Sequence, residues 1–317
     1  MDPLPPLADL HRHLDGSLRP SSVDELAHAL GKRVPADLAF SVGLGLEGAL
    51  ARFAFTLSLL QTPDAVRRVA RELCEDAASE GVTTLEVRFA PQLHGDLGAT
   101  LHQVVDAALD GLQGRAGLLL CGLYGEPPAV LRALVDVART RHGVVGIDLA
   151  GAPLPQHRWR LEDYAAAFLE AERAGLGRTV HAAEGRPPGE IRVAVERLHA
   201  QRVGHGTTLL DDPSVLELVL ARGVTVEAAP TSNVHTVAVP SLDAHPLPRW
   251  LDLGVKACVN TDNTLLSGVD APTEHRRALS IPGMTLEKLQ RAIANGHQGA
   301  FSRRPTGTPG GPRSPGS

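Results

Sequence analysis

Residues 202–229 read RVGHGTTLLDDPSVLELVLARGVTVEAA and contain one complete strand–helix–strand unit. The runs 202–206 and 224–229 are short, apolar and bounded by turn residues, a pattern typical of buried strands. Between them, Asp212-Pro213 supplies an N-cap and a proline at the first helical position, and Gly223 supplies a C-terminal stop. Strands joined by a helix pair in parallel through a crossover. This stretch therefore predicts an α/β fold with a parallel sheet.

The same alternation of short strands and longer helices runs along the whole chain. Eight candidate strands follow one another: 8–14, 82–90, 118–124, 144–150, 178–183, 202–206, 224–229 and 255–261. Eight such repeats favour a closed (β/α)8 barrel. An open doubly wound sheet is the alternative, but no GxGxxG follows the first strand, so its dinucleotide-binding form lacks support.

The segment between the first two strands, residues 15–81, is too long for one crossover helix. We expect several helices there, covering the carboxyl-terminal mouth of the barrel, one of them beginning at Thr62-Pro63. A last helix is expected at 285–301. The proline- and glycine-rich stretch 302–317 predicts a disordered tail, so residues 1–301 are expected to form a single barrel domain.

The composition excludes several classes of protein. With 31 Lys and Arg against 36 Asp and Glu, the net charge is −5, which disfavours duplex nucleic acid as a partner. No apolar run reaches the ~18 residues of a membrane span, and the acidic, proline-rich start does not resemble a signal peptide. Cys74, Cys121 and Cys258 form no CxxC pair. We therefore expect a cytoplasmic protein without a nucleic-acid or membrane partner.

Two histidines end the first strand, in His11-Arg-His13-Leu-Asp15-Gly16. Positions i and i+2 of a strand point to the same face, so His11 and His13 project together. A pair of imidazoles inside a barrel is typical of a metal site. The alternative is a hydrogen-bonded pair at the surface.

Further polar residues end three other strands. His181-Ala-Ala-Glu184 ends the fifth, Gly204-His205-Gly206 the sixth, and Asn-Thr-Asp262-Asn263 the eighth. Each has a structural alternative: Glu184 can complement a helix dipole, His205 can cap a turn, and Asp262 can be an N-cap. A closed barrel, however, gathers the carboxyl ends of all its strands around one axis, where barrel enzymes place their catalytic groups.

These four segments resemble the signature segments of the adenosine deaminases within the amidohydrolase superfamily. Further stretches match that family as well, namely Glu86-Val-Arg88-Phe-Ala-Pro91, Ile147-Asp148-Leu-Ala-Gly151 and Pro230-Thr-Ser-Asn233. The resemblance spans roughly residues 7–301. It implies a (β/α)8 barrel that holds one Zn²⁺, with His11, His13, His181 and Asp262 as ligands and a water completing the site.

The residues independently favour a single metal. Two-metal relatives bridge their ions with a carboxylated lysine from the fourth strand, whereas residues 144–150 read VVGIDLA and contain no lysine. The other zinc deaminase pattern, HxE followed by PCxxC, is also missing from the sequence.

The mechanism expected from this set follows from its charges. Zinc lowers the pKa of a bound water toward neutrality. Asp262 and His205 are expected to orient that water, accept its proton and stabilise developing charge. Glu184 is expected to protonate N1 of a purine and make C6 attackable, which requires a pKa raised by burial.

Substrate contacts come from the resemblance. Asp15 matches the acid that binds the ribose 5′-hydroxyl, Gly151 matches a glycine whose amide faces the purine, and His13 would touch both metal and ribose. Asn263 stands where the family often has an aspartate matched to purine N7, and an amide can donate to that acceptor. Ala183 replaces a usual glycine, which would add a methyl group close to the purine ring.

The predicted function is zinc-dependent hydrolysis of adenosine or 2′-deoxyadenosine to inosine or 2′-deoxyinosine and ammonia. A small residue, Ala49, at a usually bulky position of the mouth helix leaves open another 6-aminopurine substrate, such as aminodeoxyfutalosine or adenine. Hydrolysis of another amide or amidine bond, and a silent zinc- or nucleoside-binding protein, are the remaining alternatives.

Overall fold

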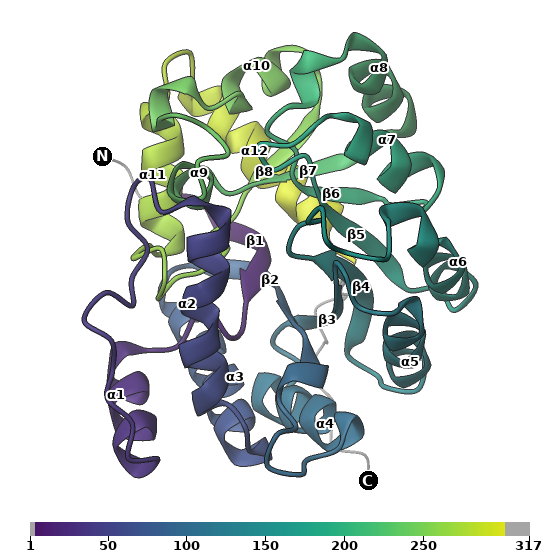
Figure 1. Ribbon diagram of the computed structural model, residues 1–317. Coiled ribbons are helices and arrows are strands. Elements are labelled where there is room, and N and C mark those ends of the chain that lie inside the picture. The colour runs from purple at the N-terminus through teal and green to yellow at the C-terminus, as the bar shows by residue number, and fades with distance from the viewer. Residues whose placement is uncertain (1–3, 302–317) are drawn as a thin grey trace, which may run out of the picture.

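The computed structural model describes residues 4–301, which form a barrel of eight parallel strands surrounded by helices (Figure 1). Each strand pairs in parallel with the next along the chain. This confirms the predicted (β/α)8 class. The strands are β1 (Leu7–His13), β2 (Val82–Phe89), β3 (Gly117–Leu123), β4 (Val144–Ala150), β5 (Gly177–Ala182), β6 (Arg202–His205), β7 (Thr225–Ala228) and β8 (Lys256–Val259).

The barrel closes where β1 meets the residues that follow β8. An isolated parallel bridge joins Arg12 to Asp262. The backbone N–H of His13 donates to the carbonyl of Asp262 at 2.7 Å, and the N–H of Asp262 donates to the carbonyl of His11 at 2.8 Å. We call this junction the seam. It places the two histidines of β1 beside the aspartate that follows β8.

Helices α3 (Pro63–Ser79) and α8 (Pro213–Arg222) begin at the capping signals that the sequence predicts. Thr62 caps α3 by accepting from the N–H of Ala65, and Asp212 caps α8. Gly223 ends α8 with φ of 63°, a left-handed conformation that glycine adopts without strain. The helices are α1 (Pro20–Ala29), α2 (Gly45–Leu59), α3 (Pro63–Ser79), α4 (Leu101–Leu112), α5 (Pro128–Ala138), α6 (Ala165–Arg173), α7 (Gly189–Glu196), α8 (Pro213–Arg222), α9 (Pro230–His235), α10 (Leu247–Asp252), α11 (Ala271–Ser280) and α12 (Leu286–Gly299).

The long segment after β1 forms three helices, and they have different roles. Helix α3 packs against β2 and α4 as the crossover helix of the barrel, whereas α2 contacts α1 and α9 and lies across the mouth (Figure 1). The amphipathic pattern of α3 buries Val66, Val69, Ala70 and Leu73. The predicted tail, 302–317, lies outside the described residues.

The apolar core fills the space between the strands and the helices, and all three cysteines are buried and unpaired. Among the helices of residues 4–301, none is long and apolar enough to cross a lipid bilayer.

Candidate active site

Side chains from β1, β5, β6 and the segment after β8 lie close together at the carboxyl ends of these strands. His11, His13 and Asp262 form one group of potential metal ligands, and His181 from β5 joins His11 in an overlapping group that also includes His205. Oδ1 of Asp262 lies 3.5 Å from Nε2 of His11 and 3.4 Å from Nε2 of His13. Nε2 of His13 lies 3.3 Å from Nε2 of His181.

These distances fit a bound metal. Ligand atoms around a tetrahedral zinc with bonds of about 2.0–2.1 Å lie about 3.3 Å apart. Nε2 of His11 is fully buried and has no hydrogen-bond partner among the described residues. A buried imidazole nitrogen that has no hydrogen-bond partner and lies beside a carboxylate and two further imidazoles is typical of a metal ligand.

Two of the histidines have a buried carboxylate beside Nδ1, on the side of the ring away from the cluster. Nδ1 of His11 lies 2.7 Å from Glu227, and Nδ1 of His181 lies 3.0 Å from Asp148. A carboxylate that accepts the Nδ1 proton fixes the tautomer of the ring and turns the Nε2 lone pair toward the metal position.

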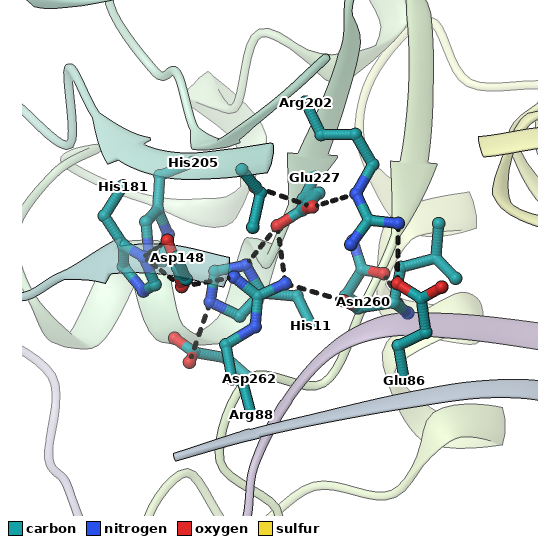
Figure 2. A network of polar contacts seen from close by, with 12 residues as sticks. His11, Glu86, Arg88, Asp148, His181, Arg202, His205, Glu227, Asn260 and Asp262 are labelled. Atoms are coloured by element: carbon teal, nitrogen blue, oxygen red, sulfur yellow. Dashed lines mark hydrogen bonds and ion pairs between the residues drawn. The ribbon is translucent and has the colours of Figure 1, made fainter. Parts of the chain in front are cut away.

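The carboxylates belong to a charge network inside the barrel (Figure 2). Arg88 donates to Asp148 at 2.7 Å and to Glu227 at 2.8 Å. Arg202 pairs with Glu227 at 2.6 Å and with Glu86 at 2.7 Å. Although burial alone would raise the pKa of the Glu227 carboxyl, the two guanidinium groups outweigh it and hold that pKa far below its usual value. Glu227 therefore stays ionised and keeps accepting from His11.

A cavity of about 230 Å³ opens above the ligand cluster, beneath α2. Its lining is mostly apolar at the end formed by α2 and polar at the barrel end. The polar lining consists of His13, Asp15, His181, Glu184, His205, Ser232, Thr236, Asp262 and Asn263, and Gly151 and Cys121 also face it. The sequence-predicted substrate and catalytic residues thus share one cavity, and His11 lies buried below it.

The surroundings of Glu184 set both the pKa and the orientation of its carboxyl. Burial, together with the nearby charge of Asp262, raises the pKa of its carboxyl to about 7. The hydroxyl of Thr236 donates to its Oε1 at 2.8 Å. Near neutral pH, a substantial fraction of Glu184 is therefore protonated and held in one orientation.

Asp15 and Asn263 lie at the junction of the first and last strands. Burial raises the pKa of Asp15 to about 7. A Cβ on Gly16 would lie 2.0 Å from Oδ1 of Asn263, so only glycine permits the amide side chain to sit there. Ala183, by contrast, is fully buried in the apolar core and is not among the described residues that line the cavity.

The backbone at the strand ends is unusual. Ala183, His205 and Asp262 have φ of 56°, 66° and 61°, in the left-handed region that non-glycine residues rarely adopt. Such strain concentrates at functional sites. At Gly204 a Cβ would lie 2.9 Å from Cε1 of His11, which explains why a glycine precedes His205.

Comparison with known proteins now identifies the family. The family profile described as "Adenosine deaminase" matches residues 6–307. The chain belongs to the adenosine deaminase family. It is 33% identical over 314 residues to the adenosine deaminase of Clostridium acetobutylicum, with 94% of this chain and 93% of that protein covered. Like the members of this family, it is a hydrolytic deaminase.

Solved structures from the adenosine deaminase family and its relatives agree with the fold. An adenine deaminase from Arthrobacter aurescens superposes with a TM-score of 0.86 at 26% identity, covering 95% of each chain. An amidohydrolase from Burkholderia ambifaria with bound Zn gives a TM-score of 0.85 at 27% identity, covering 94% of this chain and 86% of that one. One relative is thus named for adenosine and one solved structure for adenine.

Some residues of the site were not found from the sequence. Glu227 is one, although a lone acid within the apolar strand Thr225–Ala228 is a usable signal, because a buried charge needs a partner. Arg88, Asp148 and Asn233 lie in segments that match the family, but the sequence assigned them no contacts. Thr236 and His245 were not singled out at all.

Proposed function

We propose that this deaminase converts adenosine or 2′-deoxyadenosine and water to inosine or 2′-deoxyinosine and ammonia. The observation that carries the proposal is the position of Glu184. A buried carboxyl whose pKa is raised to about 7 lies in the same cavity as a cluster of three imidazoles and one carboxylate. A proton donor beside an activated water is what hydrolysis of an aromatic amine requires.

One Zn²⁺ is the proposed cofactor, held by His11, His13, His181 and Asp262. When bound, the ion makes a water nucleophilic near neutral pH. Glu227 and Asp148 hold the rings of His11 and His181 so that their Nε2 atoms face the ion.

Glu184 supplies the proton in the proposed reaction. Its protonated carboxyl donates to N1 of the purine, which makes C6 more electrophilic. Asp262 accepts a proton from the attacking water and passes it to the exocyclic nitrogen, which leaves C6 as ammonia. The hydroxyl proton at C6 then returns to Glu184 as the C6 carbonyl forms. His205 lines the same part of the cavity and stabilises the oxygen that forms at C6.

The remaining polar residues of the cavity would hold the nucleoside. Asp15 and His13 are proposed for the ribose, Gly151 for the purine through its backbone amide, and Asn263 for N7. Support comes from their common placement on the cavity wall.

The cavity favours an uncharged nucleoside over a nucleotide. Of the described residues that line it, none is lysine or arginine, and Asp15 and Asp262 are acidic. A 5′-phosphate would therefore lack a cationic partner and would meet carboxylates instead.

A second candidate is a 6-aminopurine with a different group at the ribose end, such as aminodeoxyfutalosine, or adenine alone. The observation that favours it is the apolar wall of α2, where the small side chain of Ala49 lies among Leu46, Leu50 and Phe53. A wall of this kind can accept an apolar or bulky 5′ substituent.

The deciding experiment follows the loss of the adenine absorbance band with purified zinc-loaded protein. The substrates are adenine, adenosine, 2′-deoxyadenosine, AMP and 5′-substituted analogues. We expect the highest kcat/KM for adenosine or 2′-deoxyadenosine, and a value at least about 100-fold lower for AMP. A preference for adenine or a 5′-substituted analogue would select the second candidate. Binding of a nucleoside without release of ammonia would identify a silent binding protein.

A further inference from the structure

His205 contacts a chain of side chains that the proposed function does not use. Nδ1 of His205 lies 2.9 Å from Nδ2 of Asn233 in α9. Oδ1 of Asn233 lies 3.2 Å from Nε2 of His245, in the segment before α10. Nδ1 of His245 accepts from the backbone N–H of Leu247 at 3.1 Å. We call these contacts the relay.

At His245, the backbone fixes the direction of the hydrogen bond at one end of the relay. A backbone N–H can only donate, so Nδ1 of His245 carries no proton. His245 is 3% exposed, and burial lowers the pKa of its imidazole to about 3. The ring is therefore neutral, and its single proton is on Nε2.

The donor and acceptor of each remaining hydrogen bond in the relay follow from this tautomer of His245. Because Nε2–H of His245 donates, the atom of Asn233 that faces it is the carbonyl oxygen. The amide nitrogen of Asn233 then faces His205 and donates to Nδ1. Asn233 is fully buried, so no water competes for either end of its amide. The proton of a neutral His205 must therefore be on Nε2.

Nε2 of His205 is on the side of the ring away from Asn233. His205 lines the substrate cavity, and its ring centre lies 5.0 Å from those of His11 and His181. The carboxylate of Glu184 is 3.8 Å from Nδ1, beyond hydrogen-bond distance, and does not replace Asn233 as its partner.

We propose that the relay fixes His205 as the neutral Nε2–H tautomer, so that His205 donates a hydrogen bond to the reacting oxygen and does not act as the general base. Asn233 and His245 are positioning residues in this inference. It rests on the proposed deamination for its catalytic consequence, but the tautomer itself requires only the relay.

The direct test is ¹⁵N NMR of histidine-labelled protein, with the His205 signals assigned by their loss in His205→Gln. We expect a protonated Nε2 and an unprotonated Nδ1 in His205, in both the zinc-loaded and the metal-free wild type. A protonated Nδ1 would overturn the inference. This measurement uses no substrate, so a failure of the proposed deamination would appear separately, as a wild type without turnover.

The variant Asn233→Asp tests the consequence. Aspartate has nearly the same shape and can still accept from His245, but it presents an acceptor to Nδ1 of His205. We expect the proton to move to Nδ1 and kcat to fall about 10²–10³-fold, as when one transition-state donor is lost. KM should change less than about threefold, and zinc content should not change.

Two further variants keep the test independent of folding. In His245→Leu the relay loses its fixed end, and we expect a smaller fall in kcat that His245→Gln partly restores. His275→Gln removes a buried histidine of α11 outside the relay and should leave kcat unchanged. Full activity of folded Asn233→Asp with a proton on Nδ1 would overturn the donor role.

Discussion

The proposed role of Glu184 as a proton donor depends on two properties of its carboxyl, a raised pKa and a fixed orientation. The first comes from burial and the second from Thr236, whose hydroxyl donates to Oε1. Because that donor occupies Oε1, the acidic proton of Glu184 is left to Oε2 and to the substrate.

The variant Glu184→Gln should keep zinc and bind nucleoside but lose turnover. An amide can accept from Thr236 as the carboxyl does, but it cannot transfer a proton to N1. We expect kcat to fall about 10²–10⁴-fold, the usual contribution of a general acid. Zinc content and the KM or Kd for nucleoside are measured alongside. Normal turnover in this variant would remove Glu184 from the mechanism.

Thr236→Val removes the donor to Glu184 while nearly keeping its volume. The donated hydrogen bond lowers the pKa of Glu184, so its loss raises that pKa further. Activity is lost as Glu184 deprotonates, and the alkaline limb of the kcat/KM profile should therefore move to higher pH. We expect kcat to fall roughly 10–100-fold as the carboxyl loses its orientation. Thr236→Ser keeps the hydroxyl and should restore both kcat and the position of the alkaline limb. An alkaline limb that does not move in Thr236→Val would contradict the assignment of that limb to Glu184.

Elements meet closely at the site, and glycines make this possible. The side chain of His11 on β1 reaches so close to the backbone of β6 that Gly204 has no room for a side chain beside the ring. The position of the proposed ligand His11 on β1 thus depends on the absence of a side chain at Gly204 on β6.

Gly204→Ala should push the His11 ring out of place and weaken zinc binding. A methyl group 2.9 Å from Cε1 cannot be accommodated without a shift of that ring. We expect a 10–100-fold loss of zinc affinity, comparable to the loss of an outer contact of a metal ligand. Competition with a chelator measures it. Gly189→Ala, in open space at the start of α7, is the matched control and should bind zinc normally.

Helices α9 and α11 are joined by a second buried carboxyl. Glu274 accepts from the N–H of Thr231 at 2.8 Å and also contacts the Thr231 hydroxyl. Burial raises the pKa of Glu274 from 4.5 to about 7. A group whose folded pKa is raised stabilises fully below pH 4.5, and this stability is lost as the pH rises to about 7.

Glu274→Gln should consequently stabilise the fold more at pH 8 than at pH 5. Glutamine can keep both contacts with Thr231 and has no charge to bury. The shift corresponds to at most about 3 kcal/mol between the two pH values. Thermal unfolding of wild type and variant at each pH measures it. Equal changes in Tm at pH 5 and pH 8 would show that Glu274 does not titrate in this range.

The elements were largely predictable because their signals are local. A proline after Thr62, a proline after Asp212 and a glycine at 223 act within one helical turn, and the predicted strands agree with the structure to within one or two residues at most ends. The proposed metal ligands could be named from the sequence, because each lies at or next to a strand end within a short motif.

Contacts between distant residues could not be predicted in the same way. Arg88 and Glu227 are 139 positions apart, and the sequence of neither strand indicates which distant residue its charge pairs with. The same holds for the relay, where His245 lies in a loop and resembles any other polar loop residue. Ala183 gave a misleading signal, since its methyl group joins the apolar core.

At the scale of the whole molecule, zinc should contribute to stability as well as to catalysis. A ligand that binds only the folded state stabilises it by about 2.7 kcal/mol at 100 times its Kd. We expect chelation to abolish turnover and lower Tm, and added Zn²⁺ to restore both. An enzyme that stays active after prolonged chelation, with no metal by elemental analysis, would refute the metal site.

Because the seam joins the two ends of the barrel, the proposed metal site can form only late in folding. His11 and Asp262 lie roughly 250 positions apart, so the polypeptide must close a very long loop before they meet. During synthesis, when the amino-terminal part emerges first, a chain that ends before β8 already has all three imidazoles but not yet Asp262 to complete the set. Capture of the ion therefore reports a finished barrel, and ribosome-bound fragments that end before β8 should fail to retain it.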